Sequence, residues 1–584
     1  MIKVLKRMNK REWYLTLLSI VFIIGQVWLE LRIPEYMSTI TTFVQTPGSK
    51  VQDILFSGSM MILAALGSLI AAFIVGFLAA QIAARFSKQL RESIFSKVLI
   101  FSKAEISNFS TASLITRSTN DITQIQMIIA IGLQAIVKAP IMATWALTKI
   151  AGKSWQWSLV TAFAIFIIAI VLIIISVFAV PKFKIIQKLT DSLNRVTREN
   201  ITGVRVVRAD NAENHQQNKF EEVNEPLTDT HLFVNRIIAL IGPTMSFVMS
   251  SLTLVIYWTG AYIISNANMM DRIDIFSNMV VFSAYAVQVI MSFMMLIMIF
   301  VFLPRAMVSA RRINEVLETK LSIKDGIFDV EKTQKQGSVE FRNVSFKYSD
   351  SAEYVLKEIN FIVNKGETIA IIGSTGSGKS TLVDLIPRFF DVTTGEVLVD
   401  GINVKNYRLK DLRNKLGYVS QEAILFSGNV LTNVAYGKET FNEKLVQESV
   451  EIAQAQDFIE KMEGKYKGNI ARGGTNVSGG QKQRLAIARA IYKNPEVFIF
   501  DDSFSALDFK TEKDLRKRLF EKANGTTNFI VAQRIGSIKN ADRIIVLENG
   551  EIVGIGSHEQ LLKECQTYIE IAQSQLSEEE LKNE

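Results

Sequence analysis

The sequence predicts a fusion of two parts: an α-helical transmembrane domain of six spanning helices with long cytoplasmic extensions, and an α/β domain built around a phosphate-binding loop. Three observations predict this architecture. The chain of 584 residues exceeds what one core organises, since single hydrophobic cores stop growing at roughly 250 to 300 residues. The first half contains six apolar runs of bilayer-spanning length. In the second half, short β-branched strands alternate with amphipathic helices, as in a parallel-sheet domain.

Basic residues set the orientation of the apolar runs. Five Lys and Arg side chains precede the first run, which places the N-terminus in the cytoplasm. The connections between the second and third runs, and between the fourth and fifth, are long, polar and basic, so they are cytoplasmic as well. Helical periodicity at 88–127 and 183–235 predicts that the spanning helices continue there as antiparallel pairs. The spans are expected at about 13–29, 53–85, 128–150, 153–182, 236–271 and 274–305.

Charge and cysteine content exclude several classes of protein. The net charge is +8, but the Lys and Arg residues concentrate near the ends of the apolar runs, where insertion requires them. No nucleic-acid partner is therefore expected. The single cysteine, Cys565, excludes an intrachain disulfide and a cysteine-based zinc site. No small-residue cleavage site follows the basic N-terminus, so the first run is expected to be a spanning helix rather than a secretion signal.

The composition changes near residue 330, where a charged connector gives way to the strand and helix alternation. We expect a transmembrane domain over 1–320, a connector over 321–337, an α/β domain over 338–573 and a charged tail over 574–584. Six crossings return the chain to the cytoplasm. The α/β domain is therefore expected on the same side as the N-terminus.

The segment GSTGSGKS follows the strand-like TIAII and precedes the helical KSTLVDLI, which is the context that a phosphate loop requires. Its glycines let the backbone N–H groups and the helix N-terminus point at phosphates. Lys379 adds a point charge, and Ser380 adds a hydroxyl for Mg²⁺. We expect a nucleoside triphosphate to bind here, held by Gly373, Ser374, Thr375, Gly376, Ser377, Gly378, Lys379, Ser380 and Thr381.

A strand of four apolar residues, 497–500, ends in Asp501 and Asp502. A buried strand can aim one carboxylate at a metal ion beside the phosphate loop. Asp501 is therefore predicted to coordinate Mg²⁺, directly or through water. An apolar run ending in two aspartates is weak evidence alone, and its position after the phosphate loop strengthens it.

The segment VSGGQKQR, 477–484, lies just upstream of that strand and resembles the signature sequence of ATP-binding-cassette (ABC) transporters. The resemblance covers the whole chain, because six membrane helices ahead of one nucleotide domain are similar to one half of an ABC exporter. It implies ATP and Mg²⁺ as ligands and a second homologous subunit. It also implies that Gln421 reaches Mg²⁺ and water, that Tyr348 stacks on adenine, and that SALD, 505–508, is the D-loop. Signature residues Ser478, Gly479, Gly480 and Gln481 would contact the γ-phosphate held by the opposite subunit.

Two positions depart from the family pattern. Asp502 stands where Glu is usual, and Gln533 in VAQR stands where His is usual. The Asp502 side chain is one methylene shorter than Glu, so its carboxylate is expected to fall about an ångström or more short of the attacking water. Gln533 can hydrogen-bond a phosphate but cannot take up a proton. With Gln421, these are the candidate catalytic residues, and slow hydrolysis is expected.

Two accounts explain these departures. They are either neutral changes in an active homodimer, or the marks of the degenerate-site subunit of a heterodimer whose partner has Glu and His. We favour the heterodimer, because two changes in one site beside an intact VSGGQ resemble the known asymmetric exporters. The signature of this chain would then complete the partner's active site, in the plasma membrane.

The sixth expected helix is rich in polarizable and aromatic side chains that can repack around different apolar ligands: Met279, Met291, Met294, Met295, Met298, Phe282, Tyr285, Phe293 and Phe300. This favours export of amphiphilic compounds, as in multidrug efflux, although such residues often serve packing alone. A lipid or peptide exporter is one alternative, and an ATP-gated regulatory or channel-like protein is another. Glu30 and Lys138 are charges at membrane depth that could line a water-filled cavity. Glu30 is expected near the outer headgroups, and the sequence shows no partner for Lys138.

Overall fold

The computed structural model describes residues 1–46, 48–151, 153–268, 271–328, 337–348, 353–522 and 525–575. It divides into two compact units. The first comprises Met1–Val98 and Ala112–Thr319, and the second comprises Leu99–Thr111 and Lys320–Glu584. The second unit therefore includes a short segment from the first predicted cytoplasmic extension. Residues 329–336 of the predicted connector and 576–584 of the predicted tail lie outside the described residues.

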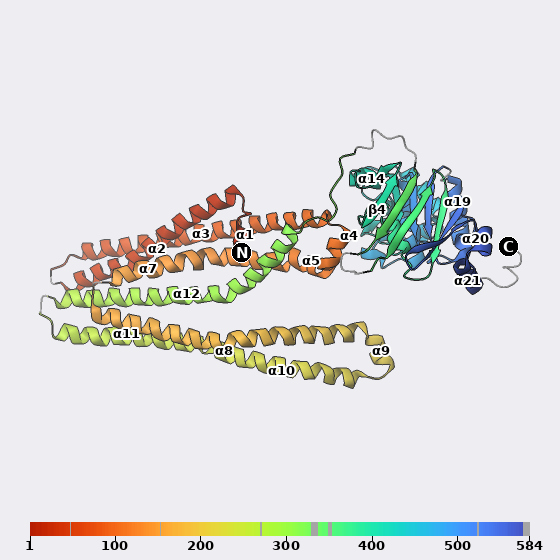
Figure 1. Ribbon diagram of the computed structural model, residues 1–584. Coiled ribbons are helices and arrows are strands. Elements are labelled where there is room, and N and C mark those ends of the chain that lie inside the picture. Colours follow the sequence, from red (N-terminus) through yellow and green to blue (C-terminus); the bar gives the residue numbers. More distant parts are fainter. Residues whose placement is uncertain are drawn as a thin grey trace. The chain divides into compact units, whose positions relative to one another are not determined.

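The first unit is a bundle of long helices (Figure 1). Within the described residues, six helices or helix series are long and apolar enough to cross a membrane, as predicted. Large apolar side chains point outward along them, including Phe56, Phe73 and Phe77 of the second span. The helices of this unit are α1 (Ile2–Leu5), α2 (Lys10–Gln45), α3 (Val51–Leu99), α5 (Thr111–Ser118), α6 (Asn120–Gly132), α7 (Ala139–Ile150), α8 (Trp155–Thr202), α9 (Val204–Ala209), α10 (Glu213–Ala239), α11 (Ile241–Ser265) and α12 (Arg272–Glu318).

The first span is longer than the sequence predicted, since α2 continues to Gln45 instead of ending near residue 29. The prediction stopped there because Glu30 interrupts the apolar run. In the structure, the two acidic side chains in the second half of α2, Glu30 and Glu35, each form an ion pair with a lysine of the same unit. Glu30 contacts Lys138 at 2.9 Å, and Glu35 contacts Lys149 at 2.6 Å. Paired charges of this kind can be kept at membrane depth.

The cytoplasmic extensions of α8 and α10 confirm the predicted antiparallel pair, and these two helices lie side by side along their length (Figure 1). The first extension differs from the prediction, because its helix breaks after Leu99. A new helix, α4 (Lys103–Phe109), begins at a capping box. The Ser102 hydroxyl accepts from the Ala104 N–H, and the Glu105 carboxylate accepts from the Ser102 N–H. This local signal ends the long helix and starts a short one.

Within its described residues the second unit contains three sheets, one of them a two-stranded antiparallel pair of β7 and β8. A mixed six-stranded sheet has the order β12-β11-β3-β10-β9-β6, with only β12 antiparallel to its neighbour, and a four-stranded antiparallel sheet has the order β2-β1-β4-β5. The strands are β1 (Val339–Phe346), β2 (Leu356–Val363), β3 (Thr368–Gly373), β4 (Thr394–Val399), β5 (Ile402–Asn403), β6 (Leu416–Val419), β7 (Gly428–Asn429), β8 (Asn469–Ile470), β9 (Val497–Asp501), β10 (Thr527–Val531), β11 (Arg543–Glu548) and β12 (Glu551–Gly556).

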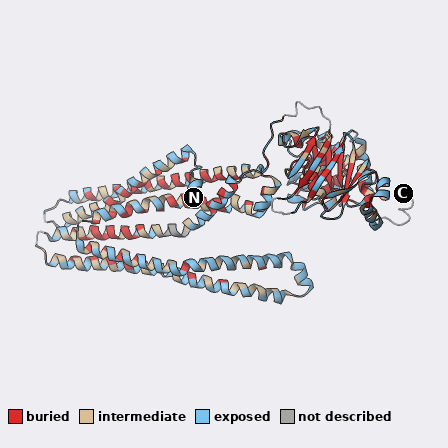
Figure 2. Ribbon diagram, in the orientation of Figure 1, coloured by how far each residue is buried: buried red, intermediate tan, exposed pale blue. Residues whose placement is uncertain are grey.

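The remaining helices of this unit are α13 (Lys379–Asp384), α14 (Leu409–Lys415), α15 (Val430–Val434), α16 (Glu443–Ile452), α17 (Gln456–Lys461), α18 (Gly479–Tyr492), α19 (Phe509–Lys522), α20 (His558–Glu564) and α21 (Gln566–Gln575), and α18 packs against β6 of the six-stranded sheet. Buried residues concentrate in the strands, whereas much of the surface of the long helices is exposed (Figure 2). This is the expected contrast between a water-soluble domain and helices whose apolar surface faces lipid.

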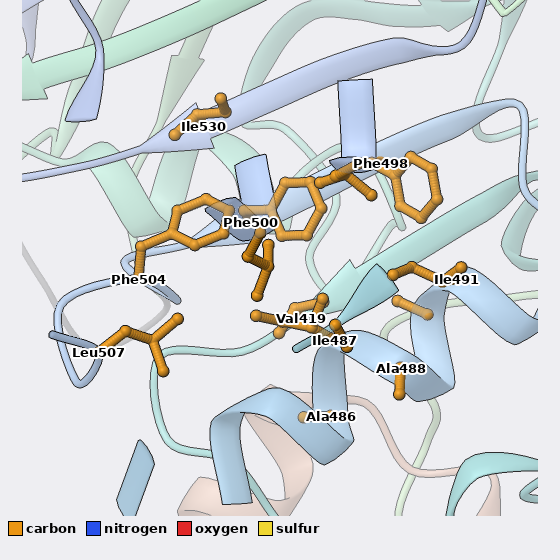
Figure 3. Close-up of a cluster of buried hydrophobic side chains, with 14 of the residues drawn as sticks. Val419, Ala486, Ile487, Ala488, Ile491, Phe498, Phe500, Phe504, Leu507 and Ile530 are labelled. Carbon is orange, nitrogen blue, oxygen red and sulfur yellow. The ribbon is translucent and has the colours of Figure 1, made fainter. Parts of the chain in front are cut away.

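The hydrophobic core packed against β9 holds this strand, which ends at Asp501 and leads directly into Asp502. Phe498 and Phe500 stack with ring centroids 5.6 Å apart, and Phe504 packs against Phe500 (Figure 3). Ile487 of α18 and Val419 of β6 belong to the same cluster. Because every residue of β9 is buried, Asp501 at its end has little freedom to move.

Candidate nucleotide-binding site

The phosphate loop joins β3 to α13, as the sequence predicted. Gly376 and Gly378 have φ values of 88° and 99°, which glycine adopts without strain. A Cβ on Gly373 would lie 2.1 Å from the carbonyl oxygen of Leu547, so only glycine fits that position. The Lys379 ammonium lies over the loop and donates to the carbonyl oxygens of Gly373 and Ser374 at 2.9 and 2.8 Å.

Asp501 and Ser380 meet at the base of this loop. The Ser380 hydroxyl donates to Asp501 Oδ1 at 2.7 Å, and the Tyr418 hydroxyl is 3.4 Å from Oδ2. Burial raises the pKa of the Asp501 carboxyl, and the nearby Asp384 adds to the rise, while the bond from Ser380 opposes it. A buried carboxylate that is costly to ionise gains most from a bound cation.

These residues fit Mg²⁺ and a triphosphate. The Ser377 hydroxyl, in the middle of the loop, is buried without a hydrogen-bond partner among the described residues. Ser380 and Asp501 supply the hydroxyl and carboxylate oxygens that Mg²⁺ prefers, and they are the residues that would hold it. A bound Mg²⁺ supplies positive charge that neutralises the phosphate oxygens.

Asp502 lies at the centre of a closed hydrogen-bond network. Its Oδ2 accepts bonds from the side-chain amides of Gln533 at 2.8 Å and Gln421 at 3.2 Å. A carboxylate only accepts, so both glutamines present their amide nitrogens. Burial raises the pKa of Asp502, against these two bonds and one from Ser505. The structure thus joins all three predicted catalytic residues.

In this network, the Asp502 carboxylate accepts hydrogen bonds from the uncharged side-chain amides of Gln421 and Gln533. A general base must reach the proton of the attacking water and accept it. Here one oxygen of Asp502 already accepts two bonds, and neither glutamine can take up a proton. The network therefore holds the Asp502 carboxylate in place through Oδ2.

The loop that carries Gln533 is fastened by the C-terminal helix α21. The Gln575 side-chain amide donates to the Gln533 carbonyl at 2.7 Å, and its oxygen accepts from the Ile535 N–H at 2.9 Å. From the sequence, Gln575 was expected in the charged tail, 574–584, and this role was not predicted. Its only sequence signal was its place at the end of a short helical pattern.

Tyr348 stands at the rim of the loop. Its hydroxyl is 2.9 Å from the Thr381 hydroxyl, and its ring packs edge-on against Phe346 and Phe390. The ring remains 37% exposed, so a face is free for an adenine base. This geometry supports the predicted role of Tyr348 without testing it.

The signature residues lie at the exposed N-terminus of α18. The Ser478 hydroxyl accepts from the Gln481 N–H, and the Gln481 side chain accepts from the Ser478 N–H at 2.9 Å, forming a capping box. Gly479 is exposed, and a Cβ added there would meet nothing within 4 Å. A helix N-terminus with free N–H groups attracts phosphate, and this one faces away from the chain's own core.

A phosphate loop, a buried strand-end aspartate and an exposed SGGQ helix on one α/β domain, fused to six spanning helices, define an ABC transporter subunit. The ABC transporter family matches residues 356–505, and the ABC transporter transmembrane region family matches residues 16–293. The chain belongs to the ABC transporter family. Its architecture is that of an exporter half, with an ATPase domain whose hydrolysis is coupled to transport.

Several known proteins are similar over nearly the whole chain. An uncharacterized ABC transporter ATP-binding protein of Mycobacterium tuberculosis is 37% identical over 507 residues, covering 85% of each chain. An ATP-dependent lipid A-core flippase of Syntrophus aciditrophicus is 32% identical, covering 88% of this chain and 84% of the flippase. The fold matches the structure of a bacterial Atm1-family ABC exporter with ATP bound, with a TM-score of 0.79 at 22% identity, covering 97% and 100% of the two chains.

The membrane unit pairs the two charges that the sequence left separate. Glu30 Oε1 accepts from Lys138 Nζ at 2.9 Å, from Gln26 at 2.9 Å and from Ser68 at 3.2 Å. Lys138 ends a π-helical stretch, Leu133–Lys138, between α6 and α7. Such stretches are frequent at functional sites. The pair lines a cavity of about 440 Å³.

The methionines of α12 divide between packing and this cavity. Met279, Phe282 and Tyr285 are buried in the bundle core, so for them the packing interpretation is correct. Met291 and Met295 line the cavity. Phe293 packs partly buried against the core, and Met294 is 37% exposed. The side chains of Met298 and Phe300 lie outside the described residues.

Proposed function

We propose that this chain is one half of a heterodimeric exporter of amphiphilic compounds in the plasma membrane. Its own ATP site retains nucleotide and hydrolyses it slowly, and its signature helix completes the partner's site. The observation that carries this proposal is the Asp502 network. The carboxylate in the position of the catalytic base is held by two amides, Gln421 and Gln533, that cannot accept a proton.

The exposed signature helix supports the second subunit. Ser478 and Gly479 are exposed at the N-terminus of α18, where the Ser478 N–H is bonded to the Gln481 side chain and the space beside Gly479 is open. Helix α9, at the tip of the second cytoplasmic extension, has no buried residue and exposes Val204 and Val206. Exposed apolar residues on a helix tip favour a protein contact. Both surfaces fit a homologous half-transporter.

The cavity at Glu30 and Lys138 supports an amphiphilic substrate. Its walls combine the side chains of Met37, Met142 and Met291 with one partly buried ion pair. The pair has no net charge, so a bound ion would leave an uncompensated charge at membrane depth. Zwitterionic amphiphiles can match both charges and keep the site neutral. Because one similar protein is a lipid A-core flippase, lipids are a second candidate substrate, and the same charge argument applies to them.

The proposal is tested by expressing the chain alone and together with a half-transporter that has Glu and His at the two altered positions, and reconstituting each in liposomes. We expect the chain alone to bind ATP with little turnover, and the pair to turn over ATP and accumulate a fluorescent amphiphile. Turnover by the chain alone at the rate of the pair would reject the heterodimer. ATP-gated flux that persists with a non-hydrolysable analogue would identify a channel instead.

The substrate class is tested with three amphiphiles that share a dodecyl chain and differ in headgroup: phosphocholine, trimethylammonium and maltoside. ATPase stimulation of the pair in nanodiscs is expected to be strongest for dodecylphosphocholine and to fall in Lys138→Met. A matched control is Lys97→Met, which removes a charge from the cytoplasmic end of α3. Equal stimulation by all three headgroups would reject charge recognition by the cavity.

A further inference from the structure

A cavity of about 480 Å³ is lined by residues of α4 and of the ATPase domain. Every lining residue belongs to the second compact unit. Phe346, Tyr348, Phe390 and Ile323 contribute aromatic and apolar walls, beside several polar side chains. Small-molecule sites usually have volumes of about 300 to 1,000 Å³ and walls of this mixed kind. The cavity is therefore suited to a small ligand or to part of one.

Tyr348 places this cavity at the ATP site. Its hydroxyl lies 2.9 Å from the hydroxyl of Thr381, the residue that follows Ser380 of the phosphate loop. Phe346 and Phe390 pack edge-on against its ring, with ring centroids 5.0 and 5.3 Å away. A base that stacks on Tyr348, as predicted, would lie at this cavity. Stacking alone accepts any base, because every base has a π-face, so selection of one base requires hydrogen bonds to its edge.

Asn108 brings an unengaged amide to the same cavity. It lies in the last turn of α4, its side chain is exposed, and within the described residues no hydrogen bond holds its amide. An asparagine amide offers an acceptor oxygen beside a donor nitrogen. The edge of adenine offers the complementary pair, an exocyclic amino group beside a ring nitrogen, and asparagine is one of the side chains that pairs with it through two hydrogen bonds.

The other polar side chains of the cavity are less suited to this role. Lys103 and Lys347 only donate, so they cannot accept from an amino group. The Asp391 carboxylate accepts from Arg388 at 2.7 and 3.2 Å. The Ser322 hydroxyl is already 3.0 Å from another serine hydroxyl. Ser107 can donate or accept equally, so it distinguishes no base from another.

We infer that Asn108 binds the exocyclic amino group of the nucleotide's base and makes this site selective for adenine. Its side-chain oxygen accepts from the amino group and its nitrogen donates to the neighbouring ring nitrogen, while Tyr348 stacks on the face of the ring. A purine without the amino group stacks in the same way but leaves the Asn108 oxygen without its partner. A residue of the first cytoplasmic extension, rather than one of the ATPase domain, thus selects the base.

The inference rests on the predicted stacking by Tyr348 and does not depend on the proposed heterodimer. It concerns binding at this chain's own site, so it applies equally to a homodimer. Failure of the stacking role and failure of the Asn108 role are distinguishable. Stacking affects the affinity for every purine nucleotide, whereas Asn108 affects the ratio between two of them.

The test compares two nucleotides on the full chain in nanodiscs. Trinitrophenyl-ATP is bound with Mg²⁺ and displaced either by ATP or by purine riboside triphosphate, which lacks the amino group. Half-displacement is expected at an ATP concentration about three- to tenfold lower than for the analogue, the range for one net hydrogen bond. Asn108→Ala should bring this ratio close to one. Asn108→Asp should preserve a preference for ATP, because a carboxylate still accepts from the amino group.

The matched control is Lys347→Ala, which removes a donor-only side chain from the same cavity and should leave the ratio unchanged. Tyr348→Ala should weaken the binding of both nucleotides. A ratio near one in the unaltered chain, a preference that survives Asn108→Ala, or a preference that Lys347→Ala also abolishes would overturn the role of Asn108. Unchanged affinity for both nucleotides in Tyr348→Ala would show that the base does not lie at this cavity, and the inference would fall with it.

Discussion

The Gln533 side-chain amide donates a 2.8 Å hydrogen bond to the carboxylate of Asp502. These are the two residues that depart from the ABC pattern, and the structure shows that they complement each other. Aspartate is short enough to leave room for the amide, and glutamine supplies a donor where an acceptor is needed for hydrolysis. The two departures therefore form one hydrogen-bonded arrangement, which supports the proposed slow hydrolysis at this site.

Restoring the family residues together should raise hydrolysis only modestly in the assembled pair. Asp502→Glu with Gln533→His returns a longer carboxylate and a titratable partner to this site. If the partner site is competent, as proposed, a second competent site can add at most about a twofold increase in total phosphate release. A rise of ten times or more would show that this chain's own site had been the main one.

Changing the signature sequence should abolish most ATP hydrolysis by the assembled pair while leaving ATP binding by this chain intact. Gly479→Asp places a negative charge where the N-terminus of α18 is proposed to meet the partner's phosphate, and loss of such stabilisation costs about a hundredfold or more in rate. Gly479→Ala is the matched control, because the space at that position is open. Full activity of Ser478→Ala combined with Gly479→Asp would show that the signature is misassigned.

Replacing Asp501, the proposed Mg²⁺ ligand, should stabilise the domain when Mg²⁺ is absent. Burial raises the pKa of Asp501, so the folded state holds its proton up to a higher pH than the unfolded state does. Stability without Mg²⁺ therefore falls as pH rises from about 4 through the raised pKa. Asp501→Asn should flatten this fall and raise the melting temperature at neutral pH in EDTA, measured by differential scanning fluorimetry. A lower melting temperature would contradict this.

Gln575 should control how long nucleotide stays bound. Gln575→Ala removes both bonds that fasten the Gln533 loop, and the loop should move more freely. We expect faster release of a fluorescent ATP analogue in stopped-flow chase experiments, with little change in melting temperature. Gln573→Ala, an exposed change on the same helix, is the control. Identical release rates in both variants would show that α21 has no such role.

The buried Lys415 should be essential for the stability of the ATPase domain. Its ammonium contacts Asp400 at 2.5 Å and Glu496 at 2.8 Å, and its side chain is 3% exposed. Removing it leaves two buried carboxylates without their cation, which costs about 3 to 5 kcal/mol. Lys415→Met should greatly reduce folded yield and denaturant resistance, whereas Lys410→Met, an exposed change in α14, should not.

The sequence predicts most of the fold and the ATP site because these depend on local patterns. Apolar length predicts the spans, and glycine spacing predicts the loop between β3 and α13. Contacts between residues far apart in sequence could not be predicted in this way. Lys138 finds Glu30 across 108 positions, and Lys103 finds Asp384 across 281. No periodicity or motif in the sequence indicates such pairs, so they are identified only in the folded structure.

The most direct test follows the fate of ATP at this chain's own site. The pair is allowed to turn over azido-ATP labelled on either the α- or the γ-phosphate, and is then photo-crosslinked and separated into its two subunits. Our account predicts equal α and γ label on this chain, because its ATP is intact, and loss of the γ label on the partner. Loss of the γ label from this chain during steady turnover would contradict the account.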